Sequence, residues 1–151
     1  MAVSGTAAAN RGSRIRGNDI VADQIIASGH FPHRVGIDAY GNGGFRFADM
    51  SHKGSLLCLP TGMHGWEVAD ASALTLESLR PALECADELD VLLIGLGPDI
   101  VAIDPAIRAA FRARRVIVEP TQTGGAIRTY NVLLAEDRAV AAALIAVEKA
   151  R

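Results

Sequence analysis

Groups that could bind an anion gather at two places in the sequence. The first is a Gly-x-Gly turn that directly follows an apolar run over residues 91–94. The second is a stretch of small and polar residues, 121–131, where a strand-like run gives way to a helical pattern. A helix that begins there would turn free backbone N–H groups and the positive end of its dipole toward a ligand. The candidate ligand-binding residues are Gly95, Gly97, Thr123, Arg128, Tyr130 and Asn131.

The same residues have a structural interpretation, which the sequence favours. Thr123 is placed either to cap the helix or to meet a ligand. Asparagine is unfavourable inside a helix, so we expect Asn131 to have a specific partner. On this interpretation the segment ties its helix to the turn at residues 95–97.

The glycine turn does not complete a dinucleotide-binding fingerprint. Ile100 occupies the third glycine position, Pro98 removes a backbone N–H, and the next helix begins only near Pro105. The sequence also contains no Walker-type phosphate loop. We therefore expect no cofactor.

The residues needed for metal or nucleophilic chemistry are not arranged for it. The histidines lack neighbouring Cys, Asp or Glu at metal-ligand spacing, so no metal site is expected. No serine stands in a Gly-x-Ser-x-Gly elbow. Cys58 lies within an apolar run, which indicates a buried, inert thiol. No catalytic residue is assigned.

Composition excludes several classes of partner. The 151 residues are 50% hydrophobic and 21% charged, with a formal net charge of −2. This balance gives no overall field to attract nucleic acid. No apolar run approaches the roughly 18 residues of a membrane span, and no signal-peptide pattern opens the chain. We expect a cytoplasmic protein that binds no nucleic acid and does not span a membrane.

The first half of the chain predicts an arm followed by strands. Residues 1–17 are small, polar and dotted with arginine, which predicts a flexible arm. Asn42-Gly43 between two alternating runs predicts a hairpin, with strands over residues 33–39 and 45–48. Residues 55–59 predict a third strand, and residues 61–66 are expected to be irregular.

The second half predicts helices that alternate with strands. Leucines at helical spacing predict a helix with Pro81 in its first turn, and the buried strand over residues 91–96 follows. Asp104-Pro105 predicts a helix start, since aspartate caps and proline suits the first turn. A strand over residues 115–119 and a helix with Ile127, Tyr130 and Leu134 on one face come next. Residues 139–147 are expected to form a last helix.

The predicted fold is α/β. We expect an N-terminal arm, residues 1–17, and a three-layer single domain, residues 18–151. A mixed sheet of about five strands would carry helices on its faces. The strand over residues 91–96 should be central and nearly fully buried.

Apolar residues predict an interface. A helix over residues 139–147 would be apolar around its whole circumference, which requires cover on more than one side. Met63 and Trp66 are residue types enriched at interface cores. Packing of this helix inside the domain is the alternative. The candidate interface residues, for a protein partner or a homo-oligomer, are Met63, Trp66, Val140 and Leu144.

The helix that begins near Pro105 has a basic face made by Arg108, Arg112 and Arg115. Such a face either binds phosphate or complements the negative end of the helix dipole. The second interpretation is favoured, because the arginines concentrate toward the helix C-terminus.

A group of motifs resembles a known family. It comprises Thr123, Ala126, the run from Arg128 through Tyr130-Asn131 to Leu133, and the following Glu136, Arg138 and Val140. The 95–97 turn, Tyr40-Gly41 with Phe45, and the 55–60 strand agree with it. These residues are similar to the Mth-domain family of uncharacterised conserved proteins, which includes the mitochondrial complex I assembly factor three and the adipogenesis-associated Mth-domain protein. The resemblance implies a three-layer α/β fold with a mixed sheet. It also implies a link to respiratory complex assembly, because the mitochondrial relative is an assembly factor rather than an enzyme. Gln122 and Gly124-Gly125 depart from the family pattern.

Two functions follow from the sequence. The favoured one is a non-catalytic binding or assembly-factor-like protein, because no nucleophile, metal cluster or complete phosphate loop is present. The other is an enzyme or binding protein for a small anionic ligand, which would occupy the crevice between the 95–97 turn and the helix start near Thr123.

Overall fold

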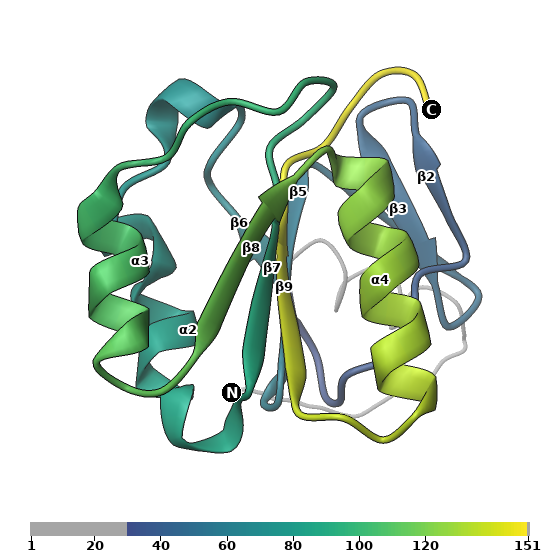
Figure 1. Cartoon of the computed structure of the whole chain (residues 1–151). Helices are drawn as coiled ribbons and strands as arrows, with labels where there is room; N and C mark the ends of the chain where they lie inside the picture. The colour runs from purple at the N-terminus through teal and green to yellow at the C-terminus, as the bar shows by residue number, and fades with distance from the viewer. Residues whose placement is uncertain (1–29, 151) are drawn as a thin grey trace.

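The protein is built in three layers around one mixed sheet. The computed structural model describes residues 30–150. In Figure 1 the sheet stands nearly edge-on, with α2 (Arg80–Glu84) and α3 (Pro105–Arg112) on one face. The other face carries α4 (Thr123–Ala135) and a small second sheet. The α/β prediction is confirmed. The predicted arm, residues 1–17, lies outside the described residues.

The main sheet has five strands of five residues each and one two-residue strand at its edge. Neighbours from β1 to β9 pair antiparallel, whereas β9–β7 and β7–β8 are parallel, so the sheet is mixed. The order is β1 (His30–Phe31), β6 (Gly62–Trp66), β5 (Ser55–Leu59), β9 (Val140–Leu144), β7 (Val91–Gly95) and β8 (Ile117–Thr121).

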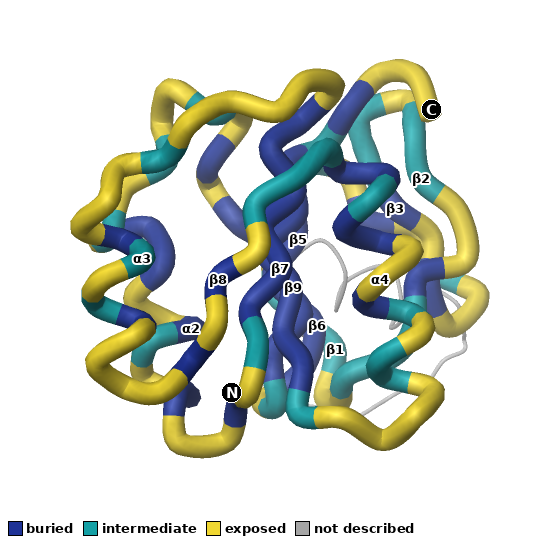
Figure 2. The backbone as a smooth tube through the Cα atoms, viewed as in Figure 1, coloured by how far each residue is buried: buried dark blue, intermediate teal, exposed yellow. Residues whose placement is uncertain are grey.

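The strand predicted over residues 91–96 is interior. β7 pairs with β9 on one side and with β8 on the other. Residues 92–96 are buried, and Figure 2 shows β7 and its neighbour β9 as largely buried strands. A continuous apolar run fits this place because both faces of the strand are covered.

The predicted hairpin forms in a separate sheet. β2 (Ala39–Gly41) and β3 (Gly44–Phe47) flank the turn, in which Asn42 and Gly43 have φ angles of 52° and 76°. Positive φ at both positions is the geometry of a type I′ turn. β4 (Met50–Lys53), which the sequence did not indicate, completes this three-stranded sheet. Residues 34–38 form no strand and lead from the main sheet into the hairpin.

The helix starts follow local rules. The Asp104 side chain accepts a hydrogen bond from the N–H of Ala106 at 2.9 Å, and Pro105 opens α3 as predicted. Pro81 lies in the first turn of α2, also as predicted. Short 3₁₀ helices precede and follow α2, at Ala71–Ala73, Glu77–Leu79 and Ala86–Glu88. Within residues 30–150, no helix has the length and apolar character needed to cross a membrane.

The prediction of a last helix over residues 139–147 is wrong. Residues Val140–Leu144 form β9, which lies between β5 and β7. Alanine favours helices by propensity, but a strand covered on both faces is apolar on both faces too. Ala141 and Ala143 face the core beneath α2 and α3, while Ala142 faces the core beneath α4. Tertiary burial therefore overrides the helical preference of alanine.

The segment predicted to be irregular, residues 61–66, is the strand β6. Its two glycines, Gly62 and Gly65, weaken the strand pattern in the sequence. A Cβ atom on Gly62 would lie 2.0 Å from the carbonyl oxygen of Phe31. The glycine is therefore required for the close approach of β1 and β6, and its φ of 132° also favours glycine.

We expect Ala142→Leu to destabilise the protein by about 1–3 kcal/mol, because the larger side chain has no space between β9 and α4. Ala142 has no exposed surface. Ala135→Leu, at an exposed position of α4, is the matched control and should change the free energy of unfolding by less than about 0.5 kcal/mol. Urea denaturation of both variants measures the difference. Equal stability of the two would contradict the central place of β9.

Candidate functional site

The Thr123 side chain joins three parts of the fold. Its hydroxyl donates to the carbonyl oxygen of Ile145 at 2.7 Å and accepts from the N–H of Gly97 at 3.0 Å. The Thr123 N–H donates to the Gly97 carbonyl oxygen at 3.0 Å. Thr123 is fully buried. One residue thus ties the start of α4 to the turn after β7, as the structural interpretation predicted, and also to the end of β9, which it did not predict.

The two glycines of the turn serve this junction. A Cβ atom on Gly95 would lie 2.9 Å from the Cα of Thr123, too close for any other residue without a backbone shift. Gly97 has a φ of 101°, in the left-handed region that favours glycine. The close approach that the glycines permit is therefore between β7 and α4, within the protein itself.

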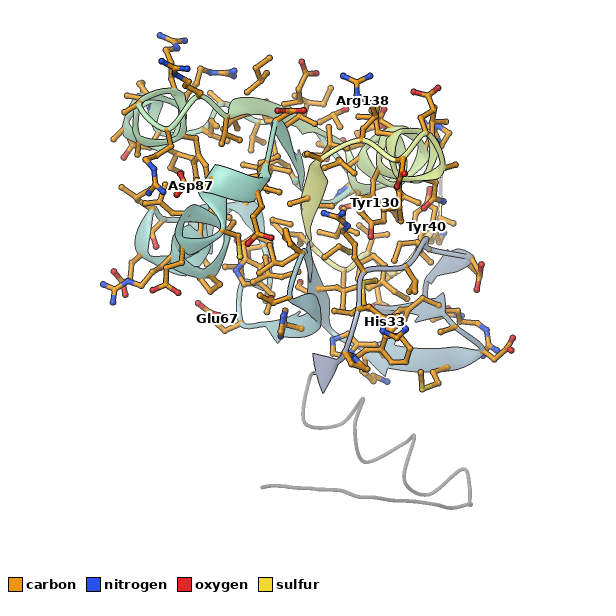
Figure 3. The ribbon with its side chains drawn as sticks, turned by 90° about the horizontal axis from the view of Figure 1, so that it is seen from below. His33, Tyr40, Glu67, Asp87, Tyr130 and Arg138 are labelled. Atoms are coloured by element: carbon orange, nitrogen blue, oxygen red, sulfur yellow. The ribbon has the colours of Figure 1, made fainter. Side chains whose placement is uncertain are left out.

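Tyr130 and Asn131 attach α4 to the segment that leads into the hairpin. The Tyr130 hydroxyl donates to the carbonyl oxygen of Val35 at 2.7 Å. The Asn131 amide accepts from the Ile37 N–H at 2.9 Å and donates to the Ile37 carbonyl oxygen at 2.8 Å. Figure 3 shows Tyr130 directed from α4 into the interior. The expected partner of Asn131 is thus a backbone segment, which it holds as a neighbouring strand would.

The predicted ligand-binding residues therefore do not converge on an open crevice. Thr123 and Gly97 bond to each other, and Tyr130 and Asn131 bond to residues 35–37. Arg128 is exposed on α4 and takes no part in either set of bonds. The polar groups of Thr123, Tyr130 and Asn131 thus make hydrogen bonds within the protein itself.

The structure also corrects the predicted interface. Its residues belong to the core, because residues 140–144 form a central strand and β6 lies inside the sheet. The Trp66 ring donates its N–H to the Ser78 carbonyl oxygen at 2.8 Å, which satisfies its one polar group. The exposed fractions are 1% for Met63, 6% for Trp66, 0% for Val140 and 0% for Leu144.

The thiol of Cys58 is held protonated. Burial raises its pKa to about 12, opposed by a hydrogen bond with Tyr130 and by the charge of nearby Arg34. Arg34 itself donates to the carbonyl oxygen of Val140 at 2.7 Å. A nucleophilic cysteine needs a lowered pKa and access to solvent, and Cys58 has neither. Burial also raises the pKa of Cys85. In the described part of the chain, no three His, Cys, Asp or Glu side chains are grouped to hold a metal ion.

A surface with a different character lies where α3 meets the edge strand β8. One hollow of about 240 Å³ is lined by Arg108, Arg112 and Arg115 together with residues 116–118. A second hollow, of about 480 Å³, shares Arg108 and Arg112 and extends to Val101 and Pro120. The two hollows form one continuous surface, which we call the arginine edge, consisting of Val101, Arg108, Arg112, Arg115, Ile117 and Pro120.

Another hollow, of about 370 Å³, lies on the three-stranded sheet. Three of the polar side chains that line it, Arg46, Ser51 and His52, are engaged within the same part of the fold. Arg46 donates to the Ser51 hydroxyl at 2.8 Å, and the ring of buried His52 is 3.0 Å from the Ser55 carbonyl oxygen. This hollow has one arginine in its lining, whereas the arginine edge has three.

A family model described as "Protein of unknown function (DUF498/DUF598)" matches residues 37–145. The chain belongs to this family. The matched region begins at Ile37, which bonds Asn131, and ends at Ile145, which bonds Thr123. Both ends of the DUF498/DUF598 region are thus held by α4.

Relatives of known structure share the DUF498/DUF598 fold. A crystal structure described as an outer membrane protein from Bartonella henselae is 50% identical, with a TM-score of 0.76, over 79% of this chain and 100% of that one. A solution structure from Bordetella pertussis, described as a Mth938-like domain, is 26% identical with a TM-score of 0.65, over 74% of this chain and 85% of that one. The expected Mth-domain relationship is confirmed.

A curated relative carries a functional name. The mouse NADH dehydrogenase [ubiquinone] 1 alpha subcomplex assembly factor 3 is 29% identical over 120 residues. The alignment covers 80% of this chain and 65% of the mouse protein, so the mouse protein has a further third that this alignment does not reach.

The sequence of this DUF498/DUF598 chain predicted only part of the arginine edge. The basic face of α3 was recognised there, but its meeting with a sheet edge was not. Pro120 carried the missing signal, because proline within a strand marks an edge strand. Ile117, the first residue of that strand, is the residue that the sequence analysis missed.

We expect Thr123→Val to destabilise the protein by about 2–4 kcal/mol, because it leaves both the Gly97 N–H and the Ile145 carbonyl buried without a partner. Thr123→Ser retains the hydroxyl and is the matched control, with a smaller loss. Chemical denaturation measures both. The structural role of Thr123 is contradicted if the valine variant is as stable as the serine variant.

We expect Cys58 to resist thiol reagents in the native protein. In Cys85→Ser it is the sole thiol, since the chain has two cysteines. At about pH 8 the native variant should stay unlabelled by a disulfide reagent and react fully in denaturant, because the buried thiol remains protonated. Rapid labelling without denaturant would contradict the burial of Cys58.

Proposed function

We propose that this protein acts by binding another protein, as an assembly-factor-like partner, and not by turning over a substrate. The observation that carries the proposal is the likeness to assembly factor 3, which extends over 80% of this chain. The alignment spans 120 residues, so the shared part has the size of a folded domain and is not a short motif.

The hydrogen bonds of Thr123 also support the proposal, because they leave fewer free donors for a small ligand. In open α/β sheets a ligand usually binds beyond the carboxyl ends of parallel strands, where helix N-termini offer free N–H groups. Here the Thr123 hydroxyl and N–H are both bonded to neighbouring backbone. A small anionic ligand would have to displace these internal bonds, so the ligand hypothesis loses the Thr123 donors and keeps only the exposed Arg128.

Co-purification from the native cells tests the proposal. The full chain, tagged and expressed at its natural level, is treated with a reversible cross-linker and isolated under mild conditions. We expect one or a few proteins to elute with it in constant proportion, and a tag on such a partner to retrieve this chain in return. A chain that elutes alone, and whose melting temperature rises in a metabolite screen, would instead identify a ligand-binding protein.

A further inference from the structure

The arginine edge exposes apolar side chains that the rest of the fold leaves uncovered. Ile117 lies opposite Val91 in the parallel register, and Val91 packs against the core on the α4 side. α4 lies over β7 and β9, so the outer strand β8 extends beyond its cover (Figures 1 and 2). Ile117 is 62% exposed as a result. Among the described residues, the large exposed hydrophobic side chains are Ile100, Val101, Ile117 and Val132.

The arginines beside these apolar groups lack acidic partners. The two ion pairs of the described chain are Arg80–Glu77 and Arg114–Asp87. Arg112 and Arg115 are exposed and take part in neither. The helix dipole accounts for a cation in the last turn of α3, where Arg112 lies. It does not account for Arg108 one turn earlier, since like charges four residues apart on a helix repel.

The edge of β8 is closed to a partner that would add a strand. In the parallel register the Ile117 N–H donates to the Asp90 carbonyl oxygen, so the polar groups of Val118 and Pro120 face outward. The Val118 carbonyl oxygen already accepts from Arg108 at 2.7 Å. Pro120 has no N–H. Arg108 and Pro120 thus prevent another strand from pairing with this edge, and such residues are common on exposed edge strands. A partner must bind here through side chains.

We propose that the arginine edge binds an acidic segment of a partner protein that also carries an apolar side chain, an inference that rests on the proposed function. Carboxylates of the segment pair with the guanidinium groups of Arg112 and Arg115, which are well suited to bidentate carboxylate contacts. The apolar side chain packs on Ile117, which lines the same hollow as these arginines. The combination of cations with aliphatic groups gives complementarity to such a segment and to few others.

Nucleic acid fits the same surface less well. Single-stranded nucleic acid is bound by stacking on aromatic side chains, and the residues that line the two hollows include none. Duplex DNA requires an extended positive field, whereas the chain has a formal net charge of −2. Exposed Ile117 and Val101 contribute nothing to phosphate contacts, but they are suited to a protein partner.

Site-specific photo-cross-linking in the native cells tests the proposal. A photoreactive amino acid replaces Ile117 in the full chain. Val132, which is similarly exposed on α4 at 56%, is the matched control position. We expect the probe at position 117 to cross-link to protein segments in which Asp or Glu residues flank an apolar residue, and the probe at position 132 not to do so. Mass spectrometry of the cross-linked peptides gives the sequence of the segment.

Charge reversal tests the role of the arginines. Arg112→Glu with Arg115→Glu should reduce the cross-link at position 117 by on the order of tenfold, because like charges then face each other. Arg138→Glu with Lys149→Glu changes the net charge equally at exposed positions outside the arginine edge and should retain the cross-link. Figure 3 shows Arg138 beside α4. Thermal melts of both double variants verify that they are folded.

The outcomes separate this inference from the proposed function. If a protein co-purifies with the chain but position 117 gives no cross-link, the arginine edge is not the binding surface and the proposed function stands. The inference also fails if the cross-links reach nucleic acid, a second copy of the chain or a basic segment, or if both double variants lose the cross-link equally. If no protein co-purifies with the wild-type chain, the proposed function itself fails.

Discussion

The fold depends on one buried hydroxyl group. Thr123 Oγ1 stands between the turn after β7 and the end of β9, and it bonds the backbone of both at 3.0 and 2.7 Å. Each such bond contributes about 0.5–1.5 kcal/mol net, and a partner left unmatched in the interior costs about 1–3 kcal/mol. The hydroxyl therefore fixes the start of α4 relative to two parallel strands. Gly95 is required because any larger residue would push α4 away from this contact.

This constraint determines where a partner can bind. α4 is held over β7 and β9 at one end by Thr123 and further along by Asn131, which bonds both polar groups of Ile37. Because α4 is fixed there, it covers less of β8 than of β7 and β9, and Ile117 remains exposed. Many α/β proteins bind ligands at the carboxyl ends of their strands. Here the polar groups of Thr123 and Gly97 at those ends form hydrogen bonds within the protein. The free groups lie instead at the sheet edge, between α3 and β8.

Part of the fold could be predicted from short local motifs in the sequence. Asp104 before Pro105 marks a helix start, and Asn42-Gly43 marks a hairpin, because both depend on neighbouring residues alone. β9 was not predictable in the same way, since its alanines favour a helix until the sheet is assembled around them. The outward face of β8 was also hidden, because strand order in a sheet is a long-range property. A tie between the helix and the turn 26 positions before Thr123 could be proposed from the sequence. The bond to Ile145, 22 positions further along, could not, because residues 139–147 were expected to form a helix.

Native-state amide hydrogen exchange, measured by NMR on the full chain, tests the central claim most directly. If the Thr123 junction holds the fold together, the Gly97 N–H opens only with global unfolding, and its protection equals the stability measured by denaturation. The Val118 N–H, which faces away from β7, should exchange far faster than its neighbours at Ile117 and Glu119. Rapid exchange of the Gly97 N–H through a local opening would show that the junction is loose and available to a ligand, which would contradict the account.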